Sequence, residues 1–454
     1  MIYEYVIQDP HRGYGPRFIL AMHARFGWRA VCIFTSERRL PRRPPELRNP
    51  ELVAASYYVP PERLTVFCDY LKQHHPIATV VPHGELEVEA AAEIAEVMDL
   101  GIWPRDVVSR FRDKASLKAY LAEVDPGIRL NFAQTVVAPK DALALARENQ
   151  LSRFVIKPND GFGNIDIGFF DGDVAGSLLE AHWARNPDTS WLMESYIEGD
   201  EYHCNGQVDA EGNITILDVG QRHNIETHDR GVICTRTDQT LTTNLVFKQI
   251  ADYTRRVITA SGLRRLPFHA EFRVDADGPV LLECGARLMG GAWANIQSAM
   301  HSPACDPFDL AAHYYGSAEP YGEPGIDWNH YDSQLFVEVR GVCRSPVTVY
   351  SLSGFREIEA WPSFHRWTKK PYIAQRLSPT DSLPNSPYAI ILRVRTAAEV
   401  DALEARVRAI LKWNEAVPTL KQRLALVRHG VGSRIRGLML KGARFGRASL
   451  MREI

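Results

Sequence analysis

Long apolar runs and paired cysteines are both missing from this 454-residue sequence. No stretch approaches the roughly 20 apolar residues of a membrane-spanning helix, so the sequence predicts no membrane span. The seven cysteines lie far apart and form no C-x-x-C pair, which argues against a zinc knuckle and a disulfide framework. We expect most of them to be small buried side chains.

An excess of charge of one sign is also lacking, because 53 basic residues stand against 55 acidic ones. The chain as a whole is therefore not drawn to nucleic acid or to an anionic membrane. An acidic residue, Glu4, stands where a secretory signal would carry basic residues, so we expect a cytoplasmic protein. The length predicts about three globular domains.

The first hundred residues alternate strand-like and helix-like patterns, which predicts parallel strands with crossover helices. From Phe154 onward strands follow one another through glycine-containing turns, which indicates an α+β core. The predicted strands are 5–8, 29–35, 78–82, 154–157, 191–196, 201–208, 214–219, 269–274, 280–283, 334–339 and 388–394. The predicted helices include one that ends at Phe26, one over 85–100, one capped by Asp113 and one over 397–412.

One predicted hairpin carries two glutamates. A three-residue loop, Ala276 to Gly278, would place Gly278 at a left-handed position. Residue 274 would then face 280, residue 273 would face 281, and Glu271 would face Glu283. Like charges at this spacing repel, so a cation should compensate them. Mg²⁺ would suit two carboxylates, because it completes its shell with water and substrate phosphates. The alternative is a hairpin whose glutamates both point into solvent.

Two segments further upstream suit a nucleotide. Lys157 ends a short strand and is followed by a glycine-containing loop, which together offer a point charge and backbone N–H groups to a polyphosphate. This loop is neither a Walker loop nor a Rossmann fingerprint. The segment 193–202 ends another strand, where backbone groups can bind an adenine edge and a nearby carboxylate can accept ribose hydroxyl groups.

In their order along the chain, these motifs resemble the ATP-grasp superfamily. The motifs that carry the resemblance are Lys114, Lys157 with its loop, Glu194 to Glu201, Glu271, and Glu283-x-x-x-Arg287 with Gly290-Gly291. The resemblance implies a fold with an N-terminal α/β domain over 1–110, a small lid subdomain over 111–200 and a central subdomain with the metal site over 201–325. A C-terminal α+β subdomain over 326–415 and a basic tail over 416–454 would follow.

The resemblance also implies roles for particular residues. ATP would be bound by Lys114, Lys157, Gly161, Phe162, Gly163, Asn164, Glu194, Ser195, Tyr196, Ile197 and Glu201. Glu271 and Glu283 would hold Mg²⁺ (or Mn²⁺), and Arg287 with Lys157 would stabilise the transferred phosphoryl group. Position 285 departs from the family pattern, because it is glycine where an asparagine usually supplies a further metal ligand.

Within the superfamily the chain looks most like the L-amino-acid ligase branch, which includes bacilysin-synthetase and carnosine-synthase types. The implied reaction joins a small carboxylate and an amine through an acyl phosphate, releasing ADP and phosphate. The candidate substrate-binding residues are His223, His269, Arg287, Gly290, Gly291 and Trp293, although either histidine could equally be structural.

Several alternatives remain open. The chain could be another ATP-grasp ligase or a carboxylase acting on a different metabolite, or a catalytically silent ATP-binding module. The basic tail could dock an acidic partner, but a solvated extension is the favoured interpretation. A homodimer is compatible with the resemblance.

Overall fold

The computed structural model describes residues 2–11, 13–37, 44–101, 104–161, 163–174, 176–226, 231–291, 293–322 and 324–411. Phe162 and the basic tail 416–454 therefore lie outside the described residues. The chain forms two compact units, Met1–Phe336 and Val337–Ile454. Across the described ranges, no helix is both long enough and apolar enough to cross a membrane.

The N-terminal segment forms a four-stranded sheet in the order β3-β2-β1-β4. Its strands are parallel, as the alternating pattern predicts, but β3 is an additional strand that the sequence did not predict. Buried aliphatic and aromatic side chains fill its strands, as is usual where helices cover both faces of a sheet. The predicted helix over 85–100 is shorter, since a 3₁₀ turn comes first and the α-helix ends at Val97. The elements are β1 (Glu4–Gln8), α1 (Gly15–Phe26), β2 (Arg29–Phe34), η2 (Pro45–Arg48), β3 (Val53–Tyr58), η3 (Pro61–Arg63), α2 (Leu64–His74), β4 (Ile77–Val81), η4 (Glu85–Glu87) and α3 (Val88–Val97).

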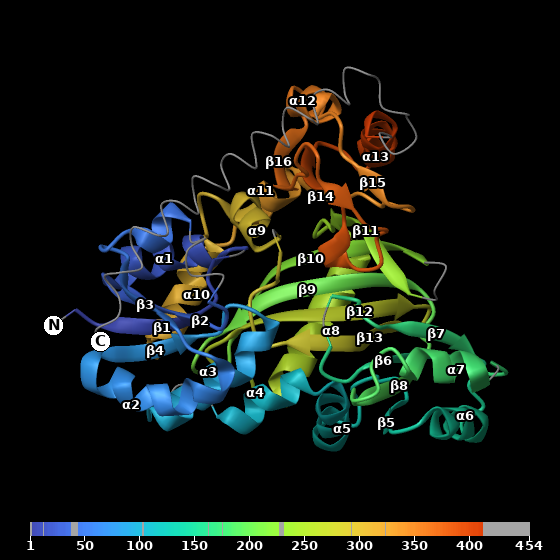
Figure 1. Ribbon diagram of the computed structural model, residues 1–454, viewed down its shortest axis with the longest axis horizontal. Helices are drawn as coiled ribbons and strands as arrows, with labels where there is room; N and C mark the ends of the chain where they lie inside the picture. The colour runs from blue at the N-terminus through green and yellow to red at the C-terminus, as the bar shows by residue number, and fades with distance from the viewer. Residues whose placement is uncertain are drawn as a thin grey trace. The chain divides into compact units, whose positions relative to one another are not determined.

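A helix from much later in the chain, α10 (Pro307–Gly316), packs beside α1 and β4 (Figure 1). The Thr79 hydroxyl donates to the Tyr315 carbonyl over 2.8 Å, and the Tyr315 ring meets Phe18 edge to face. The periodicity of the sequence contained no sign of this contact.

Two short helices, α4 (Arg105–Arg112) and α5 (Lys114–Val124), lead out of this region. The Asp113 side chain accepts a hydrogen bond from Ser116 N–H and caps α5, as predicted. Lys114 is consequently the first residue of the helix.

A second sheet is antiparallel, with strand order β5-β8-β6-β7. Its core contains Phe154, Ile156, Phe170, Trp191 and Met193, and all five are buried. The helices and strands of this part are β5 (Ala133–Val136), α6 (Pro139–Glu148), β6 (Arg153–Pro158), β7 (Gly168–Asp171), α7 (Gly176–Trp183) and β8 (Trp191–Ser195).

The central antiparallel strands follow the order β13-β12-β9-β10-β11 (Figure 1). Helix α8 packs on β9, β10 and β13. The elements are β9 (Asp200–Val208), β10 (Ile214–Glu226), β11 (Val232–Gln239), α8 (Leu245–Ser261), β12 (Pro267–Asp275), β13 (Gly278–Gly285), α9 (Trp293–His301) and α11 (Trp328–Asp332).

The hairpin between β12 and β13 corrects part of the predicted register. Two residues connect the strands, not three, and Asp275 pairs with Gly278, whose φ is +110°. Residue 274 therefore faces 279, and 273 faces 280. A β-bulge at Leu282 then adds one residue to β13, so that Glu271 pairs with Glu283 as predicted.

The second unit begins within β14 (Leu335–Arg340), and its strands follow the order β14-β18-β16. A two-stranded sheet, β15 with β17, lies in the same unit. The remaining elements are β15 (Val347–Thr348), α12 (Ser353–Glu359), β16 (Phe364–Lys369), β17 (Arg376–Leu377), η5 (Leu383–Asn385), β18 (Ala389–Val394) and α13 (Ala398–Ile410). The predicted strands 334–339 and 388–394 and the helix over 397–412 agree with β14, β18 and α13.

We expect Phe154→Ala to lower the free energy of unfolding by about 3–5 kcal/mol, because it opens a cavity in the core of the second sheet. Denaturant titration of the purified variant measures this change. Val137→Ala is the control: this side chain is 85% exposed and should change stability by less than about 0.5 kcal/mol. Equal losses in the two variants would contradict the assignment of this core.

Candidate functional site

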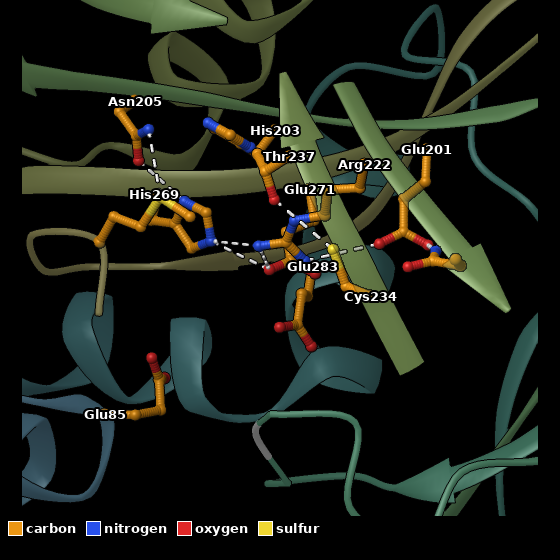
Figure 2. A network of polar contacts seen from close by, with 12 residues as sticks. Glu85, Glu201, His203, Asn205, Arg222, Cys234, Thr237, His269, Glu271 and Glu283 are labelled. Atoms are coloured by element: carbon orange, nitrogen blue, oxygen red, sulfur yellow. Dashed lines mark hydrogen bonds and ion pairs between the residues drawn. The ribbon is translucent and has the colours of Figure 1, made fainter. Parts of the chain in front are cut away.

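One face of the central sheet carries a row of polar side chains. Along β12, His269, Glu271 and Arg273 share a face because strand side chains alternate. The neighbouring strand β9 places Asn205, His203 and Glu201 directly opposite them. The sheet thus collects acids and bases from distant parts of the sequence on one surface (Figure 2).

A partly open cavity lies over this face, with about 570 Å³ of space between the atoms that includes open solvent. Apolar and charged side chains both line it, as suits a ligand with an apolar ring and an anionic chain. The lining residues are Val155, Lys157, Asn164, Ile167, Phe169, Glu194, Ser195, Tyr196, Ile197, Glu201, Val232, Glu271, Arg273, Leu282 and Glu283.

Glu271 is held by two bases. Its Oε1 lies 2.6 Å from an Arg222 nitrogen and 2.9 Å from His269 Nε2. Burial alone would raise the pKa of this carboxyl, but Arg222 and His269 together hold it well below its ordinary value. Glu271 is therefore an anion at neutral pH.

Arg222 also contacts a second carboxylate, Glu201, over 3.5 Å. Asn224 donates to the other Glu201 oxygen over 2.7 Å. Burial raises the pKa of Glu201, and the nearby Glu271 charge raises it further although Arg222 opposes this. One guanidinium therefore joins two carboxylates at the cavity wall (Figure 2).

Glu283 is compensated from another direction. Lys114 Nζ lies 3.2 Å from its Oε2 and donates over 2.7 Å to the carbonyl of Gly161. The facing pair of glutamates is thus neutralised by Arg222 and Lys114 in this structure. The interpretation that both glutamates are solvated is wrong, because their side chains are only 13% and 28% exposed.

A buried acid lies between two lysines. Glu194 pairs with Lys118 through one oxygen and with Lys157 Nζ over 2.6 Å through the other. Burial lowers the pKa of Lys118 to about 8 against the opposing pull of Glu194. For Glu194, burial would raise the pKa, but the two lysines keep it below its ordinary value.

The loop after β6 borders a second hollow of about 240 Å³. Lys114, Lys157, Gly161, Gly163, Asn164 and Glu283 line it, with Pro158, Ile165 and Ile167. The described loop residues Gly163 and Asn164 both have positive φ, +68° and +60°. The structure therefore brings the two lysines, the loop and one glutamate together.

Arg273 fixes the segment after β8. Its guanidinium donates to the Tyr196 hydroxyl over 2.7 Å and to the Ile197 carbonyl over 3.0 Å. Arg153 lies over the Tyr196 ring, with Cζ 4.2 Å from the ring centroid. Ser195, Tyr196 and Ile197 are therefore held at the cavity wall.

The predicted substrate-binding residues do not all lie at one place in the structure. Arg287 is nearly buried and donates to the Leu288 carbonyl, and Gly290 and Gly291 form an exposed turn after it. His269 joins the cavity network, and burial lowers its pKa to about 4, so it is neutral at pH 7. His223 instead contacts Asp238, with its Nε2 2.8 Å from Oδ2, and is absent from the described cavity lining.

Trp293 belongs to a buried network. It is 1% exposed and donates to Asp218 Oδ2. Asn205 and Gln297 donate to the other Asp218 oxygen over 2.7 and 3.0 Å. Asn205 also contacts His269, so this network supports the sheet beneath Glu271.

In the part of the chain that the structure describes, protein side chains alone do not form a metal site. Among the residues that the structure describes, no group of three or more histidine, cysteine, aspartate or glutamate side chains could hold an ion. The pair Glu271 and Glu283 still fits Mg²⁺, which takes few protein ligands and completes its shell with water and phosphate oxygens. All seven cysteines are buried, which the sequence predicts for most of them.

Four residues that contribute contacts in this region were not among the site residues predicted from the sequence. Arg273 could have been found, since it follows Glu271 by two residues on the same strand face. Lys118 follows Lys114 by one helical turn, which is also a readable signal. Arg222 and Glu85, which pairs with Arg287, carry no local signal because their partners are distant in sequence.

Comparison with known proteins agrees with this geometry. The ATP-grasp domain family matches residues 175–295. The chain carries an ATP-grasp domain. An L-amino acid ligase from Bacillus licheniformis covers 90% of this chain and 97% of its own length, with TM-score 0.71 and 17% identity. The ATP-grasp fold thus extends well beyond the matched segment, as the resemblance implied.

Two further proteins are similar to this chain. The biotin carboxylase domain of the Hydrogenobacter thermophilus 2-oxoglutarate carboxylase covers 91% of each chain at 14% identity and TM-score 0.61; it was solved with MgADP, ADP and bicarbonate. Dapdiamide A synthase of Enterobacter agglomerans is 27% identical over 150 residues, or 30% of this chain. This match spans 34% of the length of the synthase, about a third.

We expect Glu194→Gln to destabilise the ATP-grasp domain by about 3–5 kcal/mol, because it leaves two buried lysines without their anion. Adding Lys118→Met should recover part of this loss. Denaturant unfolding measures both changes. In the exposed pair Arg105 and Glu96, the control Glu96→Gln should cost less than about 1 kcal/mol. A double variant no more stable than Glu194→Gln would contradict the triad.

Proposed function

We propose that the protein is an ATP-dependent ligase that joins a small carboxylate, such as an amino acid, to an amine. The observation that carries the proposal is that Lys157, Glu201, Glu271 and Glu283 border one and the same cavity. These side chains offer a cation for phosphate, an acceptor for ribose hydroxyl groups and a pair of carboxylates for a metal ion.

ATP would lie with its adenine against Val155, Ile167 and Phe169 and with its edge at the backbone of Ser195 to Ile197. Glu201 would accept the ribose hydroxyl groups. Lys114 and Lys157 would contact the α- and β-phosphates, and the loop containing Gly161, Gly163 and Asn164 would cover the β- and γ-phosphates. Phe162 completes this proposed loop in the sequence.

Glu271 and Glu283 would hold Mg²⁺, which supplies neutralisation of the phosphate charge when it is bound. The fit rests on their pairing across two strands and on the ionised state of Glu271. Gly285 offers no side-chain oxygen, so the chain contributes two carboxylates and water or phosphate must complete the coordination.

The proposed reaction has two steps. A substrate carboxylate oxygen attacks the γ-phosphorus, and the bond from that phosphorus to the ADP oxygen breaks. The amine nitrogen then attacks the acyl carbon, its bond to the phosphate oxygen breaks, and the amine loses a proton. Arg287 and Lys157 would stabilise the charge that develops on the phosphoryl group. Exclusion of water around the acyl phosphate would protect it from hydrolysis.

Amino acids are the favoured substrate class because one protein with a similar fold is by name an L-amino acid ligase. His269 and Arg287 would line the place where acid and amine meet, next to Gly290 and Gly291. For His223 and Trp293, the contacts with Asp238 and Asp218 favour structural roles.

We expect ADP and phosphate to appear from Mg·ATP only when a particular acid and amine are both present. A screen of amino-acid pairs that measures phosphate and identifies the nucleotide tests this expectation. AMP as the product would overturn the acyl-phosphate route. Turnover with bicarbonate, or with an acid that is not an amino acid, would favour another ligase or a carboxylase. Tight ATP binding without turnover would favour a silent module.

We expect Arg287→Ala to lower kcat about 10²–10³-fold, because it removes a positioned cation from the developing negative charge.

Glu283→Gln should weaken the response of the rate to Mg²⁺, and chelation of Mg²⁺ should abolish turnover. Initial rates against Mg²⁺ concentration measure these effects. Glu62→Gln, an exposed change of the same chemistry, should leave the rate unchanged. A Glu283→Gln variant with the wild-type Mg²⁺ response would refute the metal assignment.

A further inference from the structure

Gly285 lies beside the carboxylate of a residue 200 positions earlier in the chain. A methyl group placed on Gly285 would lie 2.9 Å from Glu85 Oε2 and 3.5 Å from Arg287 Cζ. The first of these distances is shorter than side-chain carbons tolerate. The φ of Gly285 lies outside the left-handed region, so its backbone does not require glycine. Glycine is needed at this position for space and not for conformation.

Glu85 cannot easily move away, because two arginines hold it. Its Oε1 accepts from Arg112 over 2.8 Å, and its Oε2 pairs with Arg287. Burial would raise the pKa of the Glu85 carboxyl, but Arg287 and then Arg112 keep it below its ordinary value. Glu85 is therefore an anion that contacts two arginines. In Figure 2 its carboxyl group points toward the central sheet.

The same contacts extend to the loop after β6. Arg112 uses its other terminal nitrogen to donate to the Asp160 carbonyl over 2.7 Å. Arg287, Glu85, Arg112 and Asp160 thus form one chain of contacts. This chain joins the segment after β13 to the N-terminal 3₁₀ turn η4, helix α4 and the start of the glycine loop.

We propose that Glu85 is a positioning residue for Arg287, and that Gly285 is present because the Glu85 carboxylate occupies the space that an asparagine side chain would fill. The inference rests on the proposed function in assigning Arg287 to the reacting phosphoryl group. Glu85 would act by fixing where the guanidinium lies. Its contribution therefore depends on Arg287 being present.

The first test is a double-mutant cycle between Glu85→Gln and Arg287→Gln. We expect Glu85→Gln to lower kcat about 10- to 100-fold, as suits the loss of one close ion pair. The KM for ATP should change less than about twofold, since Glu85 is absent from the described cavity lining. In the Arg287→Gln background the same change should have no further effect on kcat.

The conservative variant Glu85→Asp should keep more activity than Glu85→Gln, because a carboxylate remains. Glu89→Gln, an exposed change on the nearby helix α3, is the control and should keep the wild-type rate. A kcat loss from Glu85→Gln that persists in full without Arg287 would overturn the proposal, since Glu85 would then act on the substrate directly.

The second test concerns space. Gly285→Asn should lower kcat as Glu85→Gln does, and it should cost nothing more when Glu85→Ala has already removed the obstructing carboxylate. Gly285→Asn with the wild-type rate would overturn the steric part of the proposal. A Gly285→Asn loss of the same size in the Glu85→Ala background would overturn it as well.

A third measurement separates this inference from the proposed function. If the wild-type chain ligates no pair of substrates, the proposed function fails, but thermal unfolding still reports the contacts. We expect the melting temperatures of the Glu85→Gln, Arg287→Gln and double variants to be non-additive, and likewise for Gly285→Asn with Glu85→Ala. Additive shifts in both cycles would refute the coupling whatever the activity is.

Discussion

Glu271 and Glu283 face each other across two hydrogen-bonded strands, and their negative charges repel unless cations lie beside them. Much of the site is arranged around this requirement. Arg222 comes from β10 and Lys114 from the start of α5, and each neutralises one of the two glutamates. Each cation also contacts a further group, Glu201 or the Gly161 carbonyl. Charge compensation therefore connects the sheet with the glycine loop.

The bulge at Leu282 is a second consequence of how these strands pair. It restores the facing of the two glutamates after a turn that is one residue shorter than the pattern predicted. The extra residue also turns its carbonyl toward Lys157, whose Nζ lies 3.4 Å away. Bulges commonly redirect groups beside functional sites. Here the bulge belongs to the same network that holds Lys157, Glu194 and Lys118.

Arg287 forms an ion pair with a residue from the N-terminal part of the chain, Glu85. Glu85 begins the 3₁₀ turn before α3, yet its two ion pairs are with residues of α4 and of the loop after β13. A glycine at position 285 leaves the space for it. A departure from the family pattern and a distant carboxylate thus have one shared physical explanation, which is that two side chains cannot occupy the same volume.

Local chemistry was readable from the sequence. The parallel N-terminal sheet, the antiparallel strands, the Asp113 cap and the pairing of Glu271 with Glu283 all follow from periods, turn residues and cap residues whose effects extend over a few positions. The roles of the nucleotide-facing residues remain predictions. The predicted length of the hairpin turn was wrong, because a glycine at position 278 is compatible with more than one loop length.

Long-range contacts were decided only by the tertiary structure. The placement of α10 against the first sheet, Arg222 between Glu201 and Glu271, and Glu85 against Gly285 all join segments with no periodic relation to one another. A sequence states which charges exist, but not which opposite charge is near enough to neutralise each one when it is buried. The sequence alone determined the elements and the chemical groups of this protein. Folding determined their partners, because burial makes an unpaired charge too costly to leave alone.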